Sequence, residues 1–372
     1  MTKSIRNYPR WTSYLIITGA HDAILLIATL MSPGVHPTLS YLIQNEQWYQ
    51  SAHFWFQWDV LWYQHIAFAG YTPLSTAFFP WVPLTIHLIP NLWFWLAVMQ
   101  FVFLGVLWAM DNIMKTLDMS QSERTWALWF FSLNPAAIYF TTLYPEPWTL
   151  FWGLMSWAAF LRGKRGTAFA MALMASLTHG TAILWGIFPL VSAMFALNSR
   201  KWLRFFDSVL WGSGFAVGFL SYMAYCWIKF ADPLIFLTVE HTKWNNHWAW
   251  PWHQWVVVLT RIPVNLITVI LMIAGIIMVV GLVGLINPVC ARFSVSWMAI
   301  AIYGTVVAVV ALAFDRTSLP VHSTIRLLSG DFPIYLGWAH VKSRSLKLLV
   351  LFIFLIYAGV GAYGFSHGFF YQ

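Results

Sequence analysis

The sequence predicts an all-α polytopic membrane protein that crosses the bilayer about ten or eleven times. Of its 372 residues, 60% are hydrophobic and 9% are charged, whereas soluble domains contain about 25% charged residues. Apolar stretches of about 17 to 25 residues, the length that crosses hydrocarbon, recur from residue 11 to residue 366. No other segment is long enough for a soluble domain, so we expect residues 1–372 to form a single integral membrane domain.

The order and orientation of the spans follow from the basic residues, because Lys and Arg accumulate on the cytoplasmic side. Alternating the spans places fifteen of the 20 basic residues in cytoplasmic segments and five on the opposite face. The first apolar stretch is long and lacks a small-residue cleavage site, so we expect it to be retained as a span. The expected spans are 11–31, 92–112, 125–142, 147–161, 166–178, 180–197, 205–228, 257–286, 295–314, 325–341 and 346–366.

Two long loops are expected on the exoplasmic side, at residues 32–91 and 229–256. The stretch from Ser32 to Thr76 contains no Lys or Arg, which fits that side. Residues 78–90 are apolar but contain three prolines, so we expect a helix along the membrane surface there. The loops are unequal and show no repeat, which favours an enzyme over a carrier built from inverted repeats. The net charge of +8 is scattered between spans, so we expect no nucleic-acid partner.

Asp59 is the first candidate catalytic residue. On a helix, Asp59 and Trp62 would be three residues apart and Trp58 and His65 seven apart, so all four would share one broad face. An aspartate beside aromatic rings can act as a base while the rings stack on a sugar. The alternative is an interfacial helix whose Trp and Tyr lie at headgroup level.

Glu146 is the second candidate catalytic residue. It is expected in a tight turn between two apolar helices, where Pro145 and Pro147 fix the backbone. The alternative is an acid that only favours the start of the next helix.

The second loop carries an aromatic and polar run from His241 to His253. Its three histidines recur every six residues, which does not match a helical zinc pattern, so we expect no metal. His241, Lys243 and Trp244 suit a rim that binds sugar hydroxyls or phosphate. They also suit an aromatic belt that anchors the next span.

Arg326 and Arg316 lie near Asp331 in the last third of the chain. Arg presents a planar fork that matches phosphate oxygens. The alternatives are a structural pair with Asp315 or Asp331, or a side chain that snorkels at a helix end. In the first span, we expect His21 and Asp22 to form a buried polar pair.

The order of these motifs resembles the GPI mannosyltransferase 2 family and its bacterial relatives, which are polytopic GT-C glycosyltransferases. The resemblance covers nearly the whole chain. Four blocks carry it: Trp58-Asp59-Val60-Leu61-Trp62-Tyr63 with Ile66-Ala67 and Gly70-Tyr71; Ala77-Phe78-Phe79-Pro80-Trp81-Val82-Pro83; Asn134-Pro135-Ala136-Ala137 with Leu143-Tyr144 and Glu146; and Arg326 with Phe332-Pro333.

The resemblance implies a GT-C-like helical bundle and transfer of mannose from a polyprenyl-phosphate donor, with inversion, on the exoplasmic face of a bacterial cell membrane. The acceptor would be a glycan, a lipid or a protein, and the surrounding partners would be membrane lipids. Asp59 would be the base and Arg326 would bind the phosphate, with no cofactor. His179 stands where relatives carry Arg, and Pro145 where they carry a small polar residue. The alternatives are a GT-C enzyme for another lipid-linked sugar, or a transporter or flippase of lipid-linked glycans.

Overall fold

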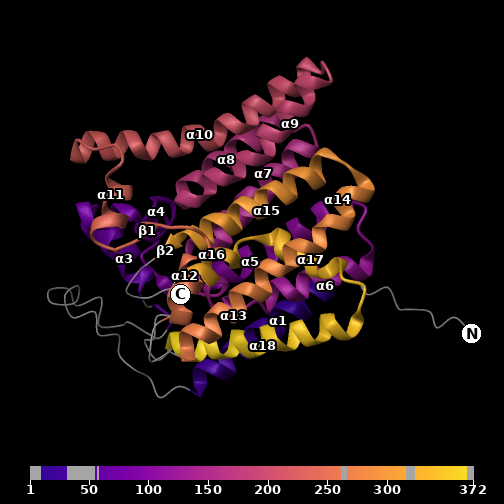
Figure 1. The fold of residues 1–372 in the computed structure, drawn as a ribbon. Coiled ribbons are helices and arrows are strands. Elements are labelled where there is room, and N and C mark those ends of the chain that lie inside the picture. Colours follow the sequence, from indigo (N-terminus) through magenta and orange to yellow (C-terminus); the bar gives the residue numbers. More distant parts are fainter. Residues whose placement is uncertain (1–9, 32–54, 57, 261–265, 316–322, 367–372) are drawn as a thin grey trace, which may run out of the picture.

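The computed structural model describes residues 10–31, 55–56, 58–260, 266–315 and 323–366, and they form a bundle of helices (Figure 1). Within these ranges the only strands are β1 (His247–Trp248) and β2 (Phe314–Asp315). They pair antiparallel, with His247 opposite Asp315. The all-α class is therefore confirmed.

Seven of the described helices are long and apolar enough to cross a membrane, so the chain is a multi-pass membrane protein. They run at similar slants through the bundle, as Figure 1 shows for α10, α15 and α18. The seven are α1 (Arg10–Leu30), α5 (Leu92–Thr116), the 3-10 helix η4 (Gly180–Gly186) with α9 (Ile187–Asn198), α10 (Trp202–Phe230), α13 (Leu266–Val280) with η5 (Gly281–Leu285) and α14 (Ile286–Arg292), α15 (Val295–Ala313) and α18 (Arg344–Ser366).

The other four predicted spans are shorter helices, so a count above seven stays a prediction. They correspond to α6 (Gln121–Ser132) with η3 (Ala137–Phe140), α7 (Pro145–Leu161), α8 (Arg165–Thr178), and α16 (Thr324–Ser329) with α17 (Phe332–His340).

Two of these predicted spans, 125–142 and 325–341, were wrong as continuous helices. The first breaks at Asn134, whose side chain accepts a hydrogen bond from the amide of Ala136. The next residue, Pro135, disfavours helical backbone in the residue before it. The second breaks at Gly330 and Asp331, and Pro333 begins the following helix, where a proline costs no hydrogen bond.

Shorter helices lie in the first and second predicted loops, and those of residues 59–88 and 235–242 gather near one end of α10 (Figure 1). The hydroxyl of Tyr222 on α10 donates to the carbonyl of Thr76 at 2.6 Å. The ring of Phe79 packs between Tyr222 and Phe236, which ties the two loop regions together. These helices are α3 (Asp59–Ala69), η2 (Pro73–Ala77), α4 (Trp81–Leu88), α11 (Ile235–Thr242) and α12 (His253–Thr260).

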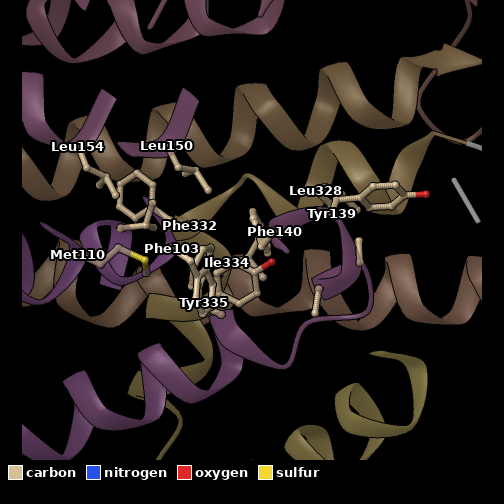
Figure 2. Packing of buried hydrophobic residues seen from close by; sticks show 14 of the residues in the cluster. Phe103, Met110, Tyr139, Phe140, Leu150, Leu154, Leu328, Phe332, Ile334 and Tyr335 are labelled. Carbon is tan, nitrogen blue, oxygen red and sulfur yellow. The ribbon is translucent and has the colours of Figure 1, made fainter. Parts of the chain in front are cut away.

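The buried core lies where α5, η3, α7, α16 and α17 meet. Figure 2 shows its aromatic and aliphatic side chains, among them Phe103, Phe140 and Phe332. Glycines allow the closest approach, because a Cβ on Gly337 of α17 would lie 1.8 Å from the carbonyl oxygen of Gly281. The α16–α17 segment, which carries Arg326, is therefore held tightly against η5.

His21 and Asp22 were expected to form a buried pair in the first span, and this prediction was wrong for Asp22. His21 is 1% exposed and contacts the carbonyl of Ser132 and the hydroxyl of Thr141. Asp22 is 36% exposed, because the helical turn of about 100° per residue carries it out of the interface that buries His21.

Candidate functional site

Three charged side chains from distant parts of the chain meet in one cluster. Arg326 Nη2 lies 2.7 Å from Asp59 Oδ2, and Arg326 Nε donates to Glu146 Oε1. The side chains of Asp59, Glu146 and Arg326 are 13%, 9% and 11% exposed, so bulk water screens the cluster poorly. The structure thus unites the two predicted catalytic residues and the predicted phosphate ligand.

The local backbone presents both carboxylates at helix starts. Asp59 is the first residue of α3, and Glu146 lies in the first turn of α7, where the helix dipole favours a negative charge. Glu146 therefore belongs to the helix itself, and the expected turn between helices was wrong. Trp58 has a φ of 57°, which is unusual for a bulky residue. The expected helical pairing of Trp58 with His65 was wrong, because Trp58 precedes the helix.

Arg326 pairs with different carboxylates from those expected as structural partners. Asp331 is fully buried, and neither of its carboxyl oxygens has a hydrogen-bond partner among the described residues. Arg316 and the side chain of Asp315 lie outside the described residues. Arg326 therefore pairs with carboxylates of α3 and α7, and not with Asp331 in its own segment.

Two tyrosines hold the Arg326 guanidinium. Its central carbon lies 4.7 Å from the ring centroid of Tyr144 and 5.3 Å from that of Tyr139. Aromatic faces attract a cation, and the attraction grows when water is excluded. Sequence reasoning assigned neither ring a role, although Tyr144 stands two residues before Glu146.

A small pocket opens beside the cluster, lined by residues of α7, η4, α15 and α16. Its polar end contains Glu146, Arg326 and His179, together with Thr149 and Thr181. Asp59 is not among its lining residues, although it lies 2.7 Å from Arg326, which is one of them. The apolar walls are Leu150, Leu184, Trp185, Tyr303, Val307, Val310, Ala311 and Leu327, with Gly330 completing the lining.

His179 lies between α8 and η4 and lines this pocket as an uncharged group. Its Nδ1 accepts from the amide of Thr181 at 3.3 Å and contacts the hydroxyl of the same residue at 2.7 Å. Burial and the nearby positive charge of Arg326 lower the pKa of His179 to about 4, against an opposing effect of Asp59. At neutral pH this position therefore offers an uncharged imidazole.

Burial raises the pKa of the Asp59 carboxyl above its ordinary value. Arg326 opposes this shift and Glu146 adds to it. A carboxylate whose pKa moves towards neutrality is a better proton acceptor at physiological pH.

Several aromatic side chains pack around Trp62 of α3, next to the charged cluster. Trp62 stacks on Phe78, with ring centroids 5.7 Å apart, and meets Trp244 of the second loop edge to face at the same distance. His65 packs edge to face against Trp62 at 6.2 Å. Three of the predicted binding residues, Trp62, His65 and Trp244, are thereby brought together.

Among the described contacts, none joins His241 or Lys243 to Asp59, Glu146 or Arg326. Both are exposed, and the ring of His241 packs against His247 with centroids 5.2 Å apart. Within the described ranges, no three His, Cys, Asp or Glu side chains lie close enough together to hold a metal ion. The expectation that no metal takes part remains a prediction.

Comparison with known proteins adds no relative. No protein-family model matches the chain, and no curated protein is significantly similar to it. The likeness to GT-C mannosyltransferases therefore stays an inference from the motifs.

Proposed function

We propose that the protein is a membrane glycosyltransferase that moves a sugar from a polyprenyl-phosphate donor to an exoplasmic acceptor. The observation that carries this proposal is the convergence of Asp59, Glu146 and Arg326 beside a pocket lined by both polar and apolar side chains. A lipid-linked sugar has the same two parts, a charged phosphate and an apolar chain.

The donor phosphate would bind at Arg326. Its contacts to Asp59 and Glu146 use Nη2 and Nε, which leaves Nη1 for an anionic oxygen. The rings of Tyr139 and Tyr144 keep the guanidinium in one orientation, so the site would be formed before the donor arrives. Val307, Val310 and Ala311 come from the candidate span α15, so a polyprenyl chain could reach the pocket from the bilayer.

The acceptor would approach Asp59 from the side away from the pocket. Asp59 would take the proton of an acceptor hydroxyl as its oxygen forms a bond to the anomeric carbon. The bond from that carbon to the phosphate oxygen would break on the opposite face, which inverts the configuration. Arg326 would stabilise the charge on the departing polyprenyl phosphate. Trp244, which is partly exposed and packs edge to face on the buried Trp62, could offer its ring to a sugar.

Mannose is the proposed sugar because of the family resemblance, and the exoplasmic face of a bacterial membrane is the proposed location. The test is incubation of purified protein with a panel of polyprenyl-phosphate sugars and acceptors, followed by mass spectrometry. Mannosylated product is expected with polyprenyl-phosphate mannose. Product from another donor alone would reassign the sugar, and an absence of product with every donor would contradict the proposal.

The roles of the two carboxylates can be separated in the same assay. Asp59→Asn should keep donor binding and lower turnover by about a hundredfold or more, the minimum loss expected on removing a general base. Glu146→Gln should act mainly on donor KM, because Glu146 lines the pocket and orients Arg326. If Glu146→Gln abolished turnover and Asp59→Asn did not, the base would be Glu146. Unchanged turnover in both would exclude the two carboxylates as the base, whereas a wild-type protein that binds the donor but forms no product would favour a transporter or flippase of lipid-linked glycans.

A further inference from the structure

A carboxylate on the first span takes no part in the proposed chemistry and is only partly enclosed by the bundle. Asp22 lies twelve residues after the start of α1 and eight before its end, which places it about 18 Å from one end and 12 Å from the other. Its side chain is 36% exposed. On a membrane-spanning helix, that surface faces hydrocarbon, where ionisable side chains are costly.

Neighbouring side chains of the protein stabilise the charge of the Asp22 carboxylate only in part. With its amide oriented to suit its neighbours, Gln100 on α5 donates from Nε2 to the two oxygens of Asp22, at 3.0 and 3.2 Å. His21 lies 4.0 Å away and is already engaged by Ser132 and Thr141. Among the described residues, none of the ion pairs of Asp22 involves Lys or Arg. The sequence of the adjoining segment 32–54 contains neither residue type.

The surface beside Asp22 allows another helix to approach closely. Gly19 and Ala23 are exposed on the same side of α1, and a Cβ on Gly19 would meet no atom within 4 Å. Small residues four apart let two membrane helices bring their backbones together. Leu26 and Phe101, which are 46% and 72% exposed, provide apolar surface on α1 and α5.

We propose that this α1–α5 face is the docking site for a transmembrane helix of another protein, which carries a Lys or Arg at the depth of Asp22. A cation there would neutralise the carboxylate in a medium of low dielectric constant, where opposite charges attract strongly. A symmetric second copy fits less well, because it would bring two Asp22 carboxylates together. The proposal is independent of the sugar-transfer activity.

The test uses the full-length chain in its native membrane, with a photo-crosslinking amino acid at Ala23. The matched control places the same amino acid at Ile356, which is 49% exposed in the middle of α18. Light should produce a protein adduct from position 23 and not from position 356. Mass spectrometry should identify a protein with a membrane span that has a Lys or Arg near its centre.

Swapping the charges of Asp22 and of the partner's basic residue then tests whether Asp22 selects that partner. Asp22→Lys should reduce the adduct at least tenfold, and changing the partner's basic residue to Asp should restore it. Recovery of the adduct with the partner's Asp separates lost docking from misfolding, because a misfolded Asp22→Lys chain would not be rescued by a change in the partner. An adduct with a second copy, an adduct with lipid alone, no adduct, or an adduct unaffected by Asp22→Lys would each overturn the proposal.

Discussion

At the scale of single residues, Arg326 has a structural role in addition to its proposed chemical one. It pairs with two carboxylates that are 13% and 9% exposed. Removing one partner from a buried ion pair costs about 3–5 kcal/mol, because the remaining charge has lost its compensation. We therefore expect Arg326→Ala to lower thermal stability clearly, and Arg326→Lys to lower it less while still weakening donor binding, since Lys lacks the planar fork.

Arg165 provides the control for this prediction. It pairs with Asp207 at 2.8 Å, but its side chain is 49% exposed. Exposed pairs contribute about 0–1 kcal/mol, so Arg165→Ala should change the unfolding temperature little. Thermal unfolding of the purified proteins in detergent provides the comparison. Equal shifts for Arg326→Ala and Arg165→Ala would show that the cluster contributes no more than a surface pair.

His179 should make the protein sensitive to acid. Its pKa is about 4 in the folded state, below the ordinary value of 6.5. Between these two values the unfolded chain binds more protons than the folded one, so stability falls as the pH drops from 6.5 towards 4. His179→Asn keeps a side-chain acceptor for the amide of Thr181 and cannot titrate. Its unfolding temperature should fall less over this pH range, and parallel curves for both proteins would contradict the assignment.

The residues of the cluster were predictable singly, but their contacts were not. Asp59, Glu146 and Arg326 each stood out because charged groups are rare in so apolar a chain. Glu146 and Arg326 are 180 positions apart, so no local spacing rule connects them. The stacking of Tyr139 and Tyr144 on Arg326 was missed for the same reason. Asp331 was a plausible partner by proximity in sequence, yet the fold directs Arg326 towards α3 and α7.

At the scale of elements, the position of Arg326 depends on how closely α17 packs against η5. A methyl group on Gly337 would lie 1.8 Å from the carbonyl oxygen of Gly281, so the backbones must separate to admit it. Overpacking of this kind costs about 1–3 kcal/mol. We expect Gly337→Ala to lower the unfolding temperature and to reduce turnover, because α16 and α17 move together.

Gly359→Ala on α18 is the matched control, since a Cβ there would meet no atom within 4 Å. Alanine is favoured over glycine inside a helix by about 0.5–1 kcal/mol, so this change should be neutral or stabilising. Thermal unfolding and the mass-spectrometric assay should be run on both variants. Equal behaviour would mean that the η5–α17 contact is not tight in solution.

Apolar length predicted the long helices well and the broken ones poorly. Each of the seven described helices that can span a membrane overlaps a predicted span, because a continuous apolar run of that length has few alternatives. The predicted span 257–286 was placed too early, since it starts in α12 whereas the candidate span runs from Thr268 to Ala291. The breaks at Asn134 and Gly330 lie inside predicted spans that were drawn from apolar length alone, although Pro135 and Pro333 stand beside them. Both fall beside cluster residues, since η3 contributes Tyr139 and α16 contributes Arg326.

At the scale of the whole molecule, α10 relates the candidate site to the membrane. Its 29 residues span about 43 Å, more than the thickness of the hydrocarbon core, so its two ends emerge on opposite sides. Figure 1 shows α9 beside one end and α11 beside the other. Trp244 follows α11 and packs on Trp62 of α3, so the α11 end of α10 lies on the side of the candidate site.

The basic residues predict that this side is exoplasmic, and thiol labelling can test the prediction at two described positions. Thr242 ends α11 and Ser199 precedes α10, and both are exposed. Cysteines should be placed there in a Cys290→Ser background, because Cys290 is exposed whereas Cys226 is buried. Thr242→Cys should react with a membrane-impermeant maleimide in intact spheroplasts, and Ser199→Cys only after permeabilisation. The reverse pattern would place the Asp59–Glu146–Arg326 cluster on the cytoplasmic side, where soluble nucleotide-sugars are available, and would remove the main reason for expecting a lipid-linked donor.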